Sequence, residues 1–360
     1  MKVIIGMSGG VDSSVSAYLL KQQGYEVEAL FMKNWDDSDN NDKCTWEEDV
    51  QDALGVCEKL KIPINTIDLT EDYWNKVFGI MLEDFKAGLT PNPDILCNQE
   101  IKFRVFMEHA LEFGAEKIAT GHYARTNAVD LGFELKKGLD DNKDQSYFLC
   151  RLNQQQLSRS IFPIGDMHKN EVRKTARKLG FSIHDKKDST GICFIGERPF
   201  KEFLSNYISI DPGLIKSVSG EVMGEHDGVY FYTIGQRKGL GIGGIKGSSN
   251  APWYIANKDI FSNTLYVAQG EDNEYLYSER LYANNLHWIT PGVPKSPLRC
   301  YAKTRYRQSD QACLVSWTED DIITVDFDSS QKAITPGQYV VFYEQDRCLG
   351  SGVITTASSL

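Results

Sequence analysis

The first half of the sequence alternates between short apolar runs and longer stretches in which apolar residues recur with helical spacing. Apolar runs of this length are typical of strands that are buried on both faces. They cover residues 2–7, 27–32, 64–69 and 117–124. The stretches between them predict amphipathic helices over residues 13–23, 47–60, 72–88 and 100–114. This alternation predicts an α/β domain with a parallel sheet that helices cover on both faces.

The pattern changes after about residue 205. Short strand-like segments rich in glycine follow, and from about residue 275 short alternating runs are separated by turn sequences such as TPG. The latter pattern is typical of a small β-barrel or sandwich. We therefore expect an α/β domain over residues 1–205, a small central domain over residues 206–275 and a C-terminal β-barrel domain over residues 276–360.

The segment GMSGGVDSS, residues 6–14, lies between the first predicted strand and the first predicted helix. Its glycines allow a tight turn, and the free amides and dipole of a helix start form an anion site. The segment lacks the lysine of the G-x-x-x-x-G-K-[ST] motif and is not G-x-G-x-x-G. S-G-G-x-D-S after a first strand instead resembles the loop of enzymes that cleave ATP to AMP and pyrophosphate while they adenylate a substrate. A plain glycine-rich turn is the alternative.

Ligands of open parallel sheets lie at the carboxyl ends of the strands. Met32 and Gly121 end the second and fourth predicted strands, so we expect both to face the same crevice as the loop. The candidate ATP-binding residues are Gly6, Met7, Ser8, Gly9, Gly10, Val11, Asp12, Ser13, Met32 and Gly121. A carboxylate beside phosphate suggests a shared magnesium ion near Asp12. The match to G-x-G-x-x-G at residues 239–244 opens no predicted helix, and we interpret it as a flexible loop.

Charge and composition narrow the class of protein. The 360 residues carry a net charge of −11, which argues against nonspecific coating of nucleic acid but leaves room for a local basic face. No apolar run approaches the roughly 20 residues of a membrane helix, and the first ten residues resemble a strand more than a signal peptide. We expect a cytoplasmic protein with mostly reduced cysteines. The eight cysteines form no C-x-x-C pair, so a structural metal is not expected.

Basic residues concentrate in two segments, residues 168–180 and 295–308. In the first, the basic positions on the predicted helix are Lys169, Arg173, Lys174, Arg177 and Lys178. If the second is a strand, one face comprises Arg299, Tyr301, Lys303, Arg305 and Arg307. Basic and aromatic groups on one face suit an RNA backbone and stacked bases. A solvated edge strand protected by basic residues is the alternative.

Two cysteines stand in stiff, polar segments: Cys97 in TPNPDILCNQEIKF and Cys193 in KKDSTGICFIGERPF. Each is either a small buried hydrophobe or a reactive thiol. Asp94 is expected to cap the helix that begins after it, which would place Cys97 in the first turn, where the dipole favours a thiolate. Cys57 lies on the apolar face formed by Val50, Ala53, Leu54, Cys57 and Leu60, and is expected in the core. The remaining five, expected to be structural, are Cys44, Cys150, Cys300, Cys313 and Cys348.

Motifs along nearly the whole chain together resemble the bacterial tRNA-specific 2-thiouridylase family. They are SGGVDSS, PNPDILCN, GHYAR, KDQSYFL, FPIGD, KNEVR, DSTGICFIG, YTIGQRKGLGI and TRYR. The resemblance implies a PP-loop (adenine nucleotide alpha hydrolase-like) domain, a small central domain and a C-terminal β-barrel. It also implies the reaction, in which ATP adenylates the C2 oxygen of the wobble uridine and an enzyme persulfide supplies sulfur, giving 2-thiouridine, AMP and pyrophosphate.

The resemblance also implies roles for individual residues. Cys193 becomes the persulfide, Cys97 is the nucleophile, and the two form a transient disulfide. Asn92, Pro93 and Asp94 lie against the target base, where Asp94 can also move a proton. The implied tRNA contacts are His122, Lys143, Asp144, Gln145, Arg305, Tyr306 and Gln338. The implied cofactors and partners are ATP, Mg²⁺, the tRNAs for Lys, Glu and Gln, and a cysteine desulfurase or sulfur-relay protein.

Two other functions use some of the same residues. An ATP-dependent amide ligase or synthetase could share the loop, but it needs an ammonia source, and no N-terminal glutaminase cysteine is present. Such an enzyme would also leave Cys97 and Cys193 without a role. A noncatalytic nucleotide- and RNA-binding module predicts that Cys97→Ser and Cys193→Ser leave function intact.

Overall fold

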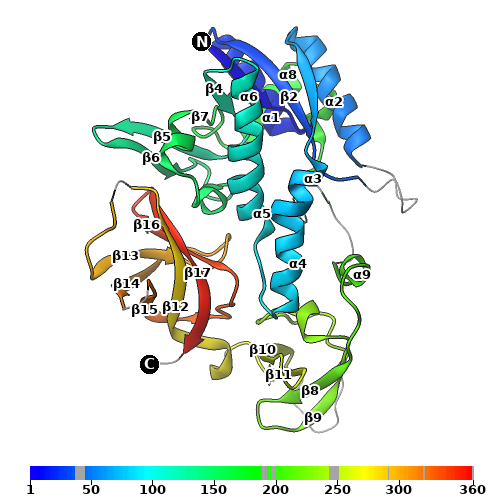
Figure 1. The fold of residues 1–360 in the computed structure, drawn as a ribbon, viewed down its shortest axis with the longest axis vertical. Coiled ribbons are helices and arrows are strands. Elements are labelled where there is room, and N and C mark those ends of the chain that lie inside the picture. The colour runs from blue at the N-terminus through cyan, green and yellow to red at the C-terminus, as the bar shows by residue number, and fades with distance from the viewer. Residues whose placement is uncertain are drawn as a thin grey trace.

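The computed structural model describes residues 1–36, 45–188, 191, 193, 195, 200–242, 251–290, 292–318 and 321–358. Cys44 and the last two residues of the segment 239–244 lie outside these ranges. Figure 1 shows a helix-covered sheet at the N-terminal end, a small sheet at the opposite end of the long axis, and a barrel beside the connecting helices. The boundaries at residues 205 and 275 remain predictions. No helix in the described ranges has the length and apolarity needed to cross a membrane.

The N-terminal domain is built on a five-stranded parallel sheet with the order β3-β2-β1-β4-β7. Its strands are β1 (Lys2–Gly6), β2 (Glu26–Lys33), β3 (Ile64–Asp68), β4 (Lys117–Ala119) and β7 (Ser160–Ile161). Successive residues of β1 serve opposite cores, since Val3 and Ile5 belong to one cluster and Ile4 to the other. The predicted parallel sheet with two covered faces is confirmed. The order reverses between β1 and β4, which is where such folds bind ligands.

Helices cover both faces of this sheet. One cluster joins the sheet to α1 (Val11–Gln22), α2 (Thr45–Leu60) and α8 (Lys169–Lys178), and the other joins it to α6 (Phe106–Glu112). Cys57 is buried in the first cluster as predicted. Leu54 was predicted to share that face, but its side chain is 42% exposed and therefore lies outside the buried face of α2.

Two long helical segments run from this domain toward the rest of the molecule (Figure 1). The first comprises α3 (Thr70–Tyr73), η2 (Trp74–Phe78) and α4 (Gly79–Lys86). The second comprises α5 (Pro93–Leu96), the π-helical η3 (Cys97–Val105) and α6. It begins at Pro93, before the helix predicted over residues 100–114, and Cys97 therefore lies after its first turn and not within that turn. Short elements complete the domain: η4 (Ser146–Leu149), α7 (Gln154–Ser158) and η5 (Ser182–Asp185).

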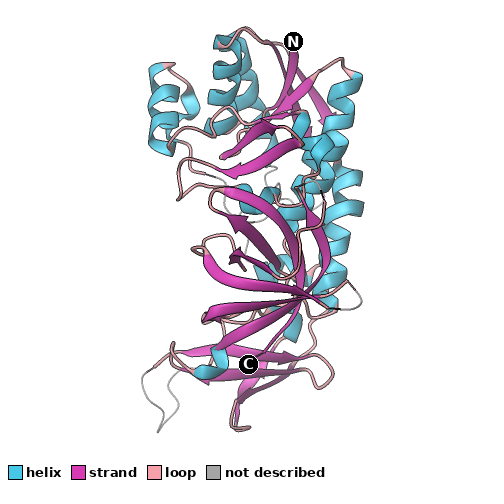
Figure 2. Ribbon diagram, turned by 90° about the vertical axis from the view of Figure 1, so that its left-hand side faces the viewer, coloured by secondary structure: helices cyan, strands magenta, loops and turns pink. Residues whose placement is uncertain are grey.

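The central part of the chain forms a four-stranded sheet with the order β10-β11-β8-β9. The strands are β8 (Gly213–Ser217), β9 (Val222–His226), β10 (Trp253–Asp259) and β11 (Thr264–Gln269), and only the β8–β11 pair is parallel among them. The short helices here are α9 (Phe200–Ser205), η6 (Val229–Phe231) and η7 (Glu274–Leu276). In Figure 2 this sheet lies lowest, below the barrel and the N-terminal domain.

The C-terminal strands close into a six-stranded antiparallel barrel, because β12 pairs with both β15 and β17. The strands are β12 (Tyr277–Trp288), β13 (Leu298–Lys303), β14 (Gln311–Trp317), β15 (Ile323–Lys332), β16 (Tyr339–Glu344) and β17 (Arg347–Ser358). The predicted barrel is confirmed. The hairpin β5 (Ala124–Val129) and β6 (Gly132–Lys137) extends from the N-terminal domain and pairs with β17, which ties the two domains together.

Two predicted strands end early. The strand predicted over residues 117–124 stops at Ala119, and β5 begins only at Ala124. β13 stops at Lys303, so Arg305 and Arg307 lie in a turn and do not continue the face of Arg299 and Tyr301. The predicted five-residue basic face of a strand is therefore wrong.

Candidate active site

The glycine-rich loop connects the end of β1 to the start of α1. Gly9 has a φ of +70°, and a Cβ there would lie 2.3 Å from the backbone oxygen of Asp49, so only glycine fits. The Ser13 and Ser14 hydroxyls donate to the Gly10 carbonyl oxygen at 3.1 and 2.8 Å, and the Ser8 amide donates to Ser13 Oγ at 3.3 Å. These bonds hold the loop in a tight turn in front of the helix start.

The other predicted nucleotide residues surround this loop. A Cβ on Gly121 would lie 2.7 Å from the Ser13 amide nitrogen, so the segment after β4 lies directly against the loop. A Cβ on Gly6 would lie 3.3 Å from the Met32 methyl group at the end of β2. The carboxyl ends of three neighbouring strands therefore meet at one place, which is where the sequence predicted the ligand.

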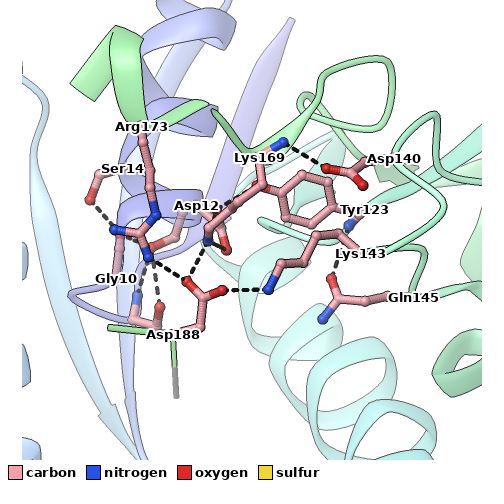
Figure 3. A network of polar contacts seen from close by, with 12 residues as sticks. Gly10, Asp12, Ser14, Tyr123, Asp140, Lys143, Gln145, Lys169, Arg173 and Asp188 are labelled. Atoms are coloured by element: carbon pink, nitrogen blue, oxygen red, sulfur yellow. Dashed lines mark hydrogen bonds and ion pairs between the residues drawn. The ribbon is translucent and has the colours of Figure 1, made fainter. Parts of the chain in front are cut away.

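A network of ions that the sequence did not reveal lies over the loop (Figure 3). Asp12 accepts hydrogen bonds from Lys169 Nζ at 2.8 Å on both oxygens and from the Tyr123 hydroxyl at 2.8 Å. Lys169 Nζ also lies 2.6 Å from a carboxylate oxygen of Asp188. Lys169 was predicted as one of the basic helix residues that supply positive charge to tRNA phosphates, but its side chain is buried and points to the loop (Figure 3).

Asp188 gathers three cations at the loop. Lys143, Lys169 and Arg173 lie 2.7, 2.6 and 2.9 Å from its oxygens. Burial alone would raise the pKa of Asp188, but hydrogen bonds from Lys143 and Lys169 lower it to about 2. The loop has no lysine of its own, and lysines from distant segments supply positive charge in its place. The sequence did offer one indication of the role of Lys169, namely its position at the start of α8. This helix follows β7, and the carboxyl end of β7 lies at the same edge of the sheet as the loop.

Cys97 is the first residue of η3 and follows the short helix α5, which begins with a side-chain cap. The cap is Asn92, whose side chain accepts from the Ile95 amide at 3.2 Å, and Pro93 occupies the first helical position. The predicted capping role of Asp94 is therefore wrong. Asp94 instead accepts a hydrogen bond from the Cys193 amide at 3.2 Å. It thereby fixes the segment that carries the second cysteine.

The structure brings the two singled-out cysteines together although they are 96 residues apart in the sequence. Both are free thiols, Cys97 is fully buried, and the two side chains are close enough for each to shift the pKa of the other. The Tyr73 hydroxyl donates to the Cys193 carbonyl oxygen at 2.7 Å, and Lys102 Nζ lies 3.4 Å from Cys193 Sγ. Sequence analysis missed Tyr73 and Lys102, which come from two different helical segments.

The two thiols have opposite electrostatic preferences. Burial and the hydrogen bond to Cys193 raise the pKa of Cys97 well above its usual range. The hydrogen bond from Cys97, aided by the charge of Lys102, lowers the pKa of Cys193 despite its burial. The prediction that the helix dipole makes Cys97 the thiolate is therefore wrong, because burial of a charge outweighs the dipole. The arrangement favours an anion on Cys193.

The barrel contributes directly to the position of Cys97. Gln338 Nε2 donates to the carbonyl oxygens of Thr90 and Pro91 at 2.8 and 3.1 Å. Its Oε1 accepts from Asn92 Nδ2 at 3.3 Å. Gln338 thus holds the loop that leads into α5, and its side chain is committed to the protein in this structure.

Several other residues predicted to contact tRNA also make internal contacts. Asp144 is buried and accepts from the Gly138 and Ser146 amides at 3.0 Å. Gln145 Oε1 accepts from the Tyr123 amide at 2.9 Å. These contacts position backbone beside the ion network.

His122, Tyr306 and Arg305 lie in three different environments. His122 is buried with Nδ1 2.7 Å from Thr120 Oγ1, and burial together with the charge of Lys102 lowers its pKa well below the usual range. Tyr306 packs on Phe148 with ring centroids 4.3 Å apart, and Arg305 is exposed beside it. Arg305 is the candidate best placed to meet a large ligand.

The sheet order, the S-G-G-x-D-S loop at its switch point and the paired thiols define a PP-loop nucleotide-binding α/β protein fused to a β-barrel. Family profiles match the chain in three parts: "tRNA methyl transferase HUP domain" over residues 1–197, "tRNA methyl transferase PRC-barrel domain" over 201–269 and "Aminomethyltransferase beta-barrel domain" over 278–354.

Full-length relatives identify the family more specifically. The tRNA-specific 2-thiouridylase MnmA of Legionella pneumophila (strain Paris) is 54% identical over 355 residues, which cover 98% of both chains. The protein of the same name from Geobacillus thermodenitrificans is 54% identical over 353 residues, covering 98% of this chain and 94% of the relative. That from Actinobacillus pleuropneumoniae serotype 3 is 55% identical, with 98% and 91% covered. The chain belongs to the tRNA-specific 2-thiouridylase family, and the predicted resemblance is confirmed.

Proposed function

We propose that this protein is a tRNA sulfurtransferase that replaces the C2 oxygen of the wobble uridine by sulfur at the expense of ATP. The observation that supports this function most strongly is the placing of Cys193 near Cys97, held by Asp94 and Lys102, in the domain that carries the nucleotide loop. The family profiles are described as tRNA methyl transferase domains, but methyl transfer gives such a thiol pair no role. An amide ligase leaves it equally unexplained.

In the first step, the loop amides and the α1 dipole bind the phosphates of ATP. Three cations that now pair with Asp188 are proposed to bind phosphate oxygens in its place: Lys143, Lys169 and Arg173. The uridine C2 oxygen attacks the α-phosphate and pyrophosphate leaves. The C2 oxygen thereby becomes part of a phosphate ester that can depart as AMP.

The residues at the loop do not form a magnesium site by themselves. Within the described ranges, no three His, Cys, Asp or Glu side chains are grouped to hold a metal, and both oxygens of Asp12 accept from Lys169. Mg²⁺ would therefore arrive with the ATP phosphates, with Asp12 as its nearest carboxylate from the loop. When bound, it would neutralise phosphate charge.

In the second step, a persulfide on Cys193 releases its outer sulfur. The Cys97 thiol passes its proton to the outer sulfur, and the Cys97 sulfur attacks the inner one. The Cys97–Cys193 disulfide forms, the sulfur–sulfur bond of the persulfide breaks, and hydrosulfide leaves. The Cys97 sulfur is oxidised while the transferred sulfur is reduced. Hydrosulfide then adds to C2 of the adenylated uridine and AMP departs, with Asp94 placed to move a proton.

The proposed partners are those that the family resemblance implies. The anticodon loops of the tRNAs for Lys, Glu and Gln are the proposed substrates, and such unpaired bases are read after they are turned outward. Arg305 and Tyr306 are the proposed contacts on the barrel, while Asn92, Pro93, His122, Lys143, Asp144, Gln145 and Gln338 are proposed to shape the base pocket. A cysteine desulfurase or a relay protein would supply sulfur, and the cytoplasm is the proposed location.

The test incubates unmodified tRNA with the protein, ATP, Mg²⁺ and a persulfide donor, followed by mass spectrometry of the nucleosides. We expect 2-thiouridine together with AMP and pyrophosphate, and loss of the product in Cys97→Ser and Cys193→Ser. A methylated nucleoside formed in a parallel incubation with S-adenosylmethionine as methyl donor would support the methyl transferase alternative. Retained product in both serine variants would refute the sulfur-transfer mechanism.

A further inference from the structure

Lys102 reaches the cysteine pair because η3 is a π-helix. In an α-helix, residues three and four apart share a face. In η3 the hydrogen bonds run from residue i to i+5, as the bond from the Phe106 amide to the Ile101 carbonyl oxygen illustrates. This wider turn brings residues five apart onto one face, and Lys102 follows Cys97 by five positions. An ordinary helix would direct the two side chains apart.

The surroundings make Lys102 the cation of this pocket. Its Nζ donates to Cys193 Sγ at 3.4 Å, and among the residues that the structure describes no other cationic side chain is hydrogen-bonded to that sulfur. The other titratable groups facing the pocket are Cys97, Asp94, Tyr73 and His122. Burial would lower the pKa of Lys102, but attraction from Cys193, Cys97 and Asp94 outweighs burial and raises it. Lys102 therefore stays charged.

We propose that Lys102 decides which of the two cysteines accepts sulfur, by holding the sulfur of Cys193 as an anion while Cys97 remains a thiol. This proposal rests on the proposed function and assigns a residue to its sulfur-loading step. The Cys193 thiolate attacks the outer sulfur of a donor persulfide, R–S–SH. The donor's sulfur–sulfur bond breaks, the proton moves to the departing donor thiol, and Cys193 carries the sulfur as an anionic persulfide beside Lys102. The Cys193 sulfur is oxidised and the donor's inner sulfur is reduced.

The experiment measures the pH dependence of iodoacetamide labelling at each cysteine of the full-length protein, resolved by peptide mass spectrometry. In the wild-type protein we expect Cys193 to be labelled with a lower pH midpoint than Cys97. Lys102→Met keeps the length and apolar stem of the side chain but removes the charge, and it should raise the Cys193 midpoint by about one pH unit or more. Lys102→Arg keeps the charge and should stay near the wild type.

Arg104→Met is the matched control, because Arg104 lies on the same helix but is exposed and paired with Glu100 at 2.8 Å. It should leave the Cys193 midpoint unchanged. An unshifted midpoint in a folded Lys102→Met protein, or an equal shift in Arg104→Met, would overturn the proposal. If Lys102→Met does not fold, the wild type alone still decides, since labelling of Cys97 before Cys193 contradicts the assignment.

The labelling requires neither tRNA nor ATP, so it fails independently of the proposed function. A wild-type protein that makes no 2-thiouridine but keeps the low, Lys102-dependent Cys193 midpoint refutes the function and supports the electrostatic assignment. A protein that makes 2-thiouridine equally well with Lys102→Met at neutral pH, with no change in midpoint, supports the function and overturns the role of Lys102.

Discussion

The N-terminal domain and the barrel each contain a pair of neighbouring cysteines. Cys97 and Cys193 meet from segments far apart in the sequence. Cys300 and Cys313 stand directly opposite each other on β13 and β14, with their sulfur atoms 3.8 Å apart. Proximity of two cysteines therefore does not by itself distinguish a reactive pair from a structural one.

The charged groups around the sulfurs do distinguish the pairs. Cys193 has the ammonium group of Lys102 at 3.4 Å and a lowered pKa. Cys313 lies in the apolar barrel core, where the hydrogen bond to Cys300 and burial raise its pKa far above the usual range. The first pair has one sulfur prepared as an anion and one as a thiol. The asymmetry of charge, and not the proximity of the sulfurs, is what we expect to support thiol exchange.

The largest predicted effect is that a single reaction cycle converts the Cys97–Cys193 pair, and not the Cys300–Cys313 pair, to a disulfide. Without reductant, protein preloaded with persulfide should make about one 2-thiouridine per chain and then stop with a Cys97–Cys193 disulfide. Dithiothreitol to reduce the disulfide, followed by fresh persulfide donor to reload Cys193, should restore turnover, and Cys97→Ser should lower product formation by roughly 10³-fold or more. Nonreducing peptide mass spectrometry identifies the linkage. A protein with both Cys300 and Cys313 changed to Ala should behave as wild type, and a Cys300–Cys313 linkage that tracks product would reverse the comparison.

The next effect concerns Asp94, the carboxylate that accepts a hydrogen bond from the Cys193 amide. Asp94→Asn keeps an oxygen that can accept the Cys193 amide but loses the acidic proton, so the single-turnover rate should fall by roughly 10–100-fold. Asp94→Ala also loses the bond to Cys193 and should fall further. Because burial raises the pKa of Asp94, the wild-type rate should depend on the ionisation of this group, and the Asn variant should lack that limb of the pH profile. Equal rates for Asn and wild type would leave Asp94 only a positioning role.

Sequence patterns predicted those parts of the molecule that local physics determines. The apolar runs of β1 to β3 and the S-G-G-x-D-S loop depend only on residues that are close in the sequence, and both were located correctly. Closure of the barrel depends on the pairing of β12 with β17, which alternating patterns do not encode. The cap at Asn92 was misassigned to Asp94, although Pro93 at the first helical position was a usable signal.

The residues that were missed all act through long-range contacts. Lys102 depends on the π-helical register of η3, and Lys169 depends on the packing of α8 against the loop. The role of Asp188 is evident only in the folded structure, where three cations surround it. The thiolate was assigned to the wrong cysteine because helix position was visible in the sequence and burial was not. Motifs therefore located the loop and the two cysteines, while the charged groups around them became visible only in the fold.

A smaller effect tests whether the reactive pair depends on its nucleotide neighbour. Lys169→Met removes one charge-assisted hydrogen bond to phosphate and should raise the KM for ATP by about tenfold. Labelling of Cys193 should not change, since Lys169 contacts the loop and not the thiols. Lys174→Met is the control on the same helix, because Lys174 is exposed and makes no ion pair within the described residues. An altered Cys193 midpoint in Lys169→Met would show that the loop and the thiols are electrostatically coupled.

The smallest predicted effect concerns stability. Substitution in the barrel pair should lower stability but not activity, and substitution in the first pair should lower activity but not stability. Cys313 is fully buried among Val315 and Val325, so Cys313→Ala leaves a small cavity and should lower the free energy of unfolding by about 1 kcal/mol. Its 2-thiouridine yield should stay within about twofold of wild type, because the cavity lies far from the reacting sulfurs. Cys193→Ala should show the opposite combination, with activity lost and the melting temperature nearly unchanged, since Cys193 is only partly buried. Thermal melts and nucleoside analysis on the same preparations measure both quantities. If Cys313→Ala reduced activity without lowering stability, the barrel pair would have to be treated as a second functional thiol pair.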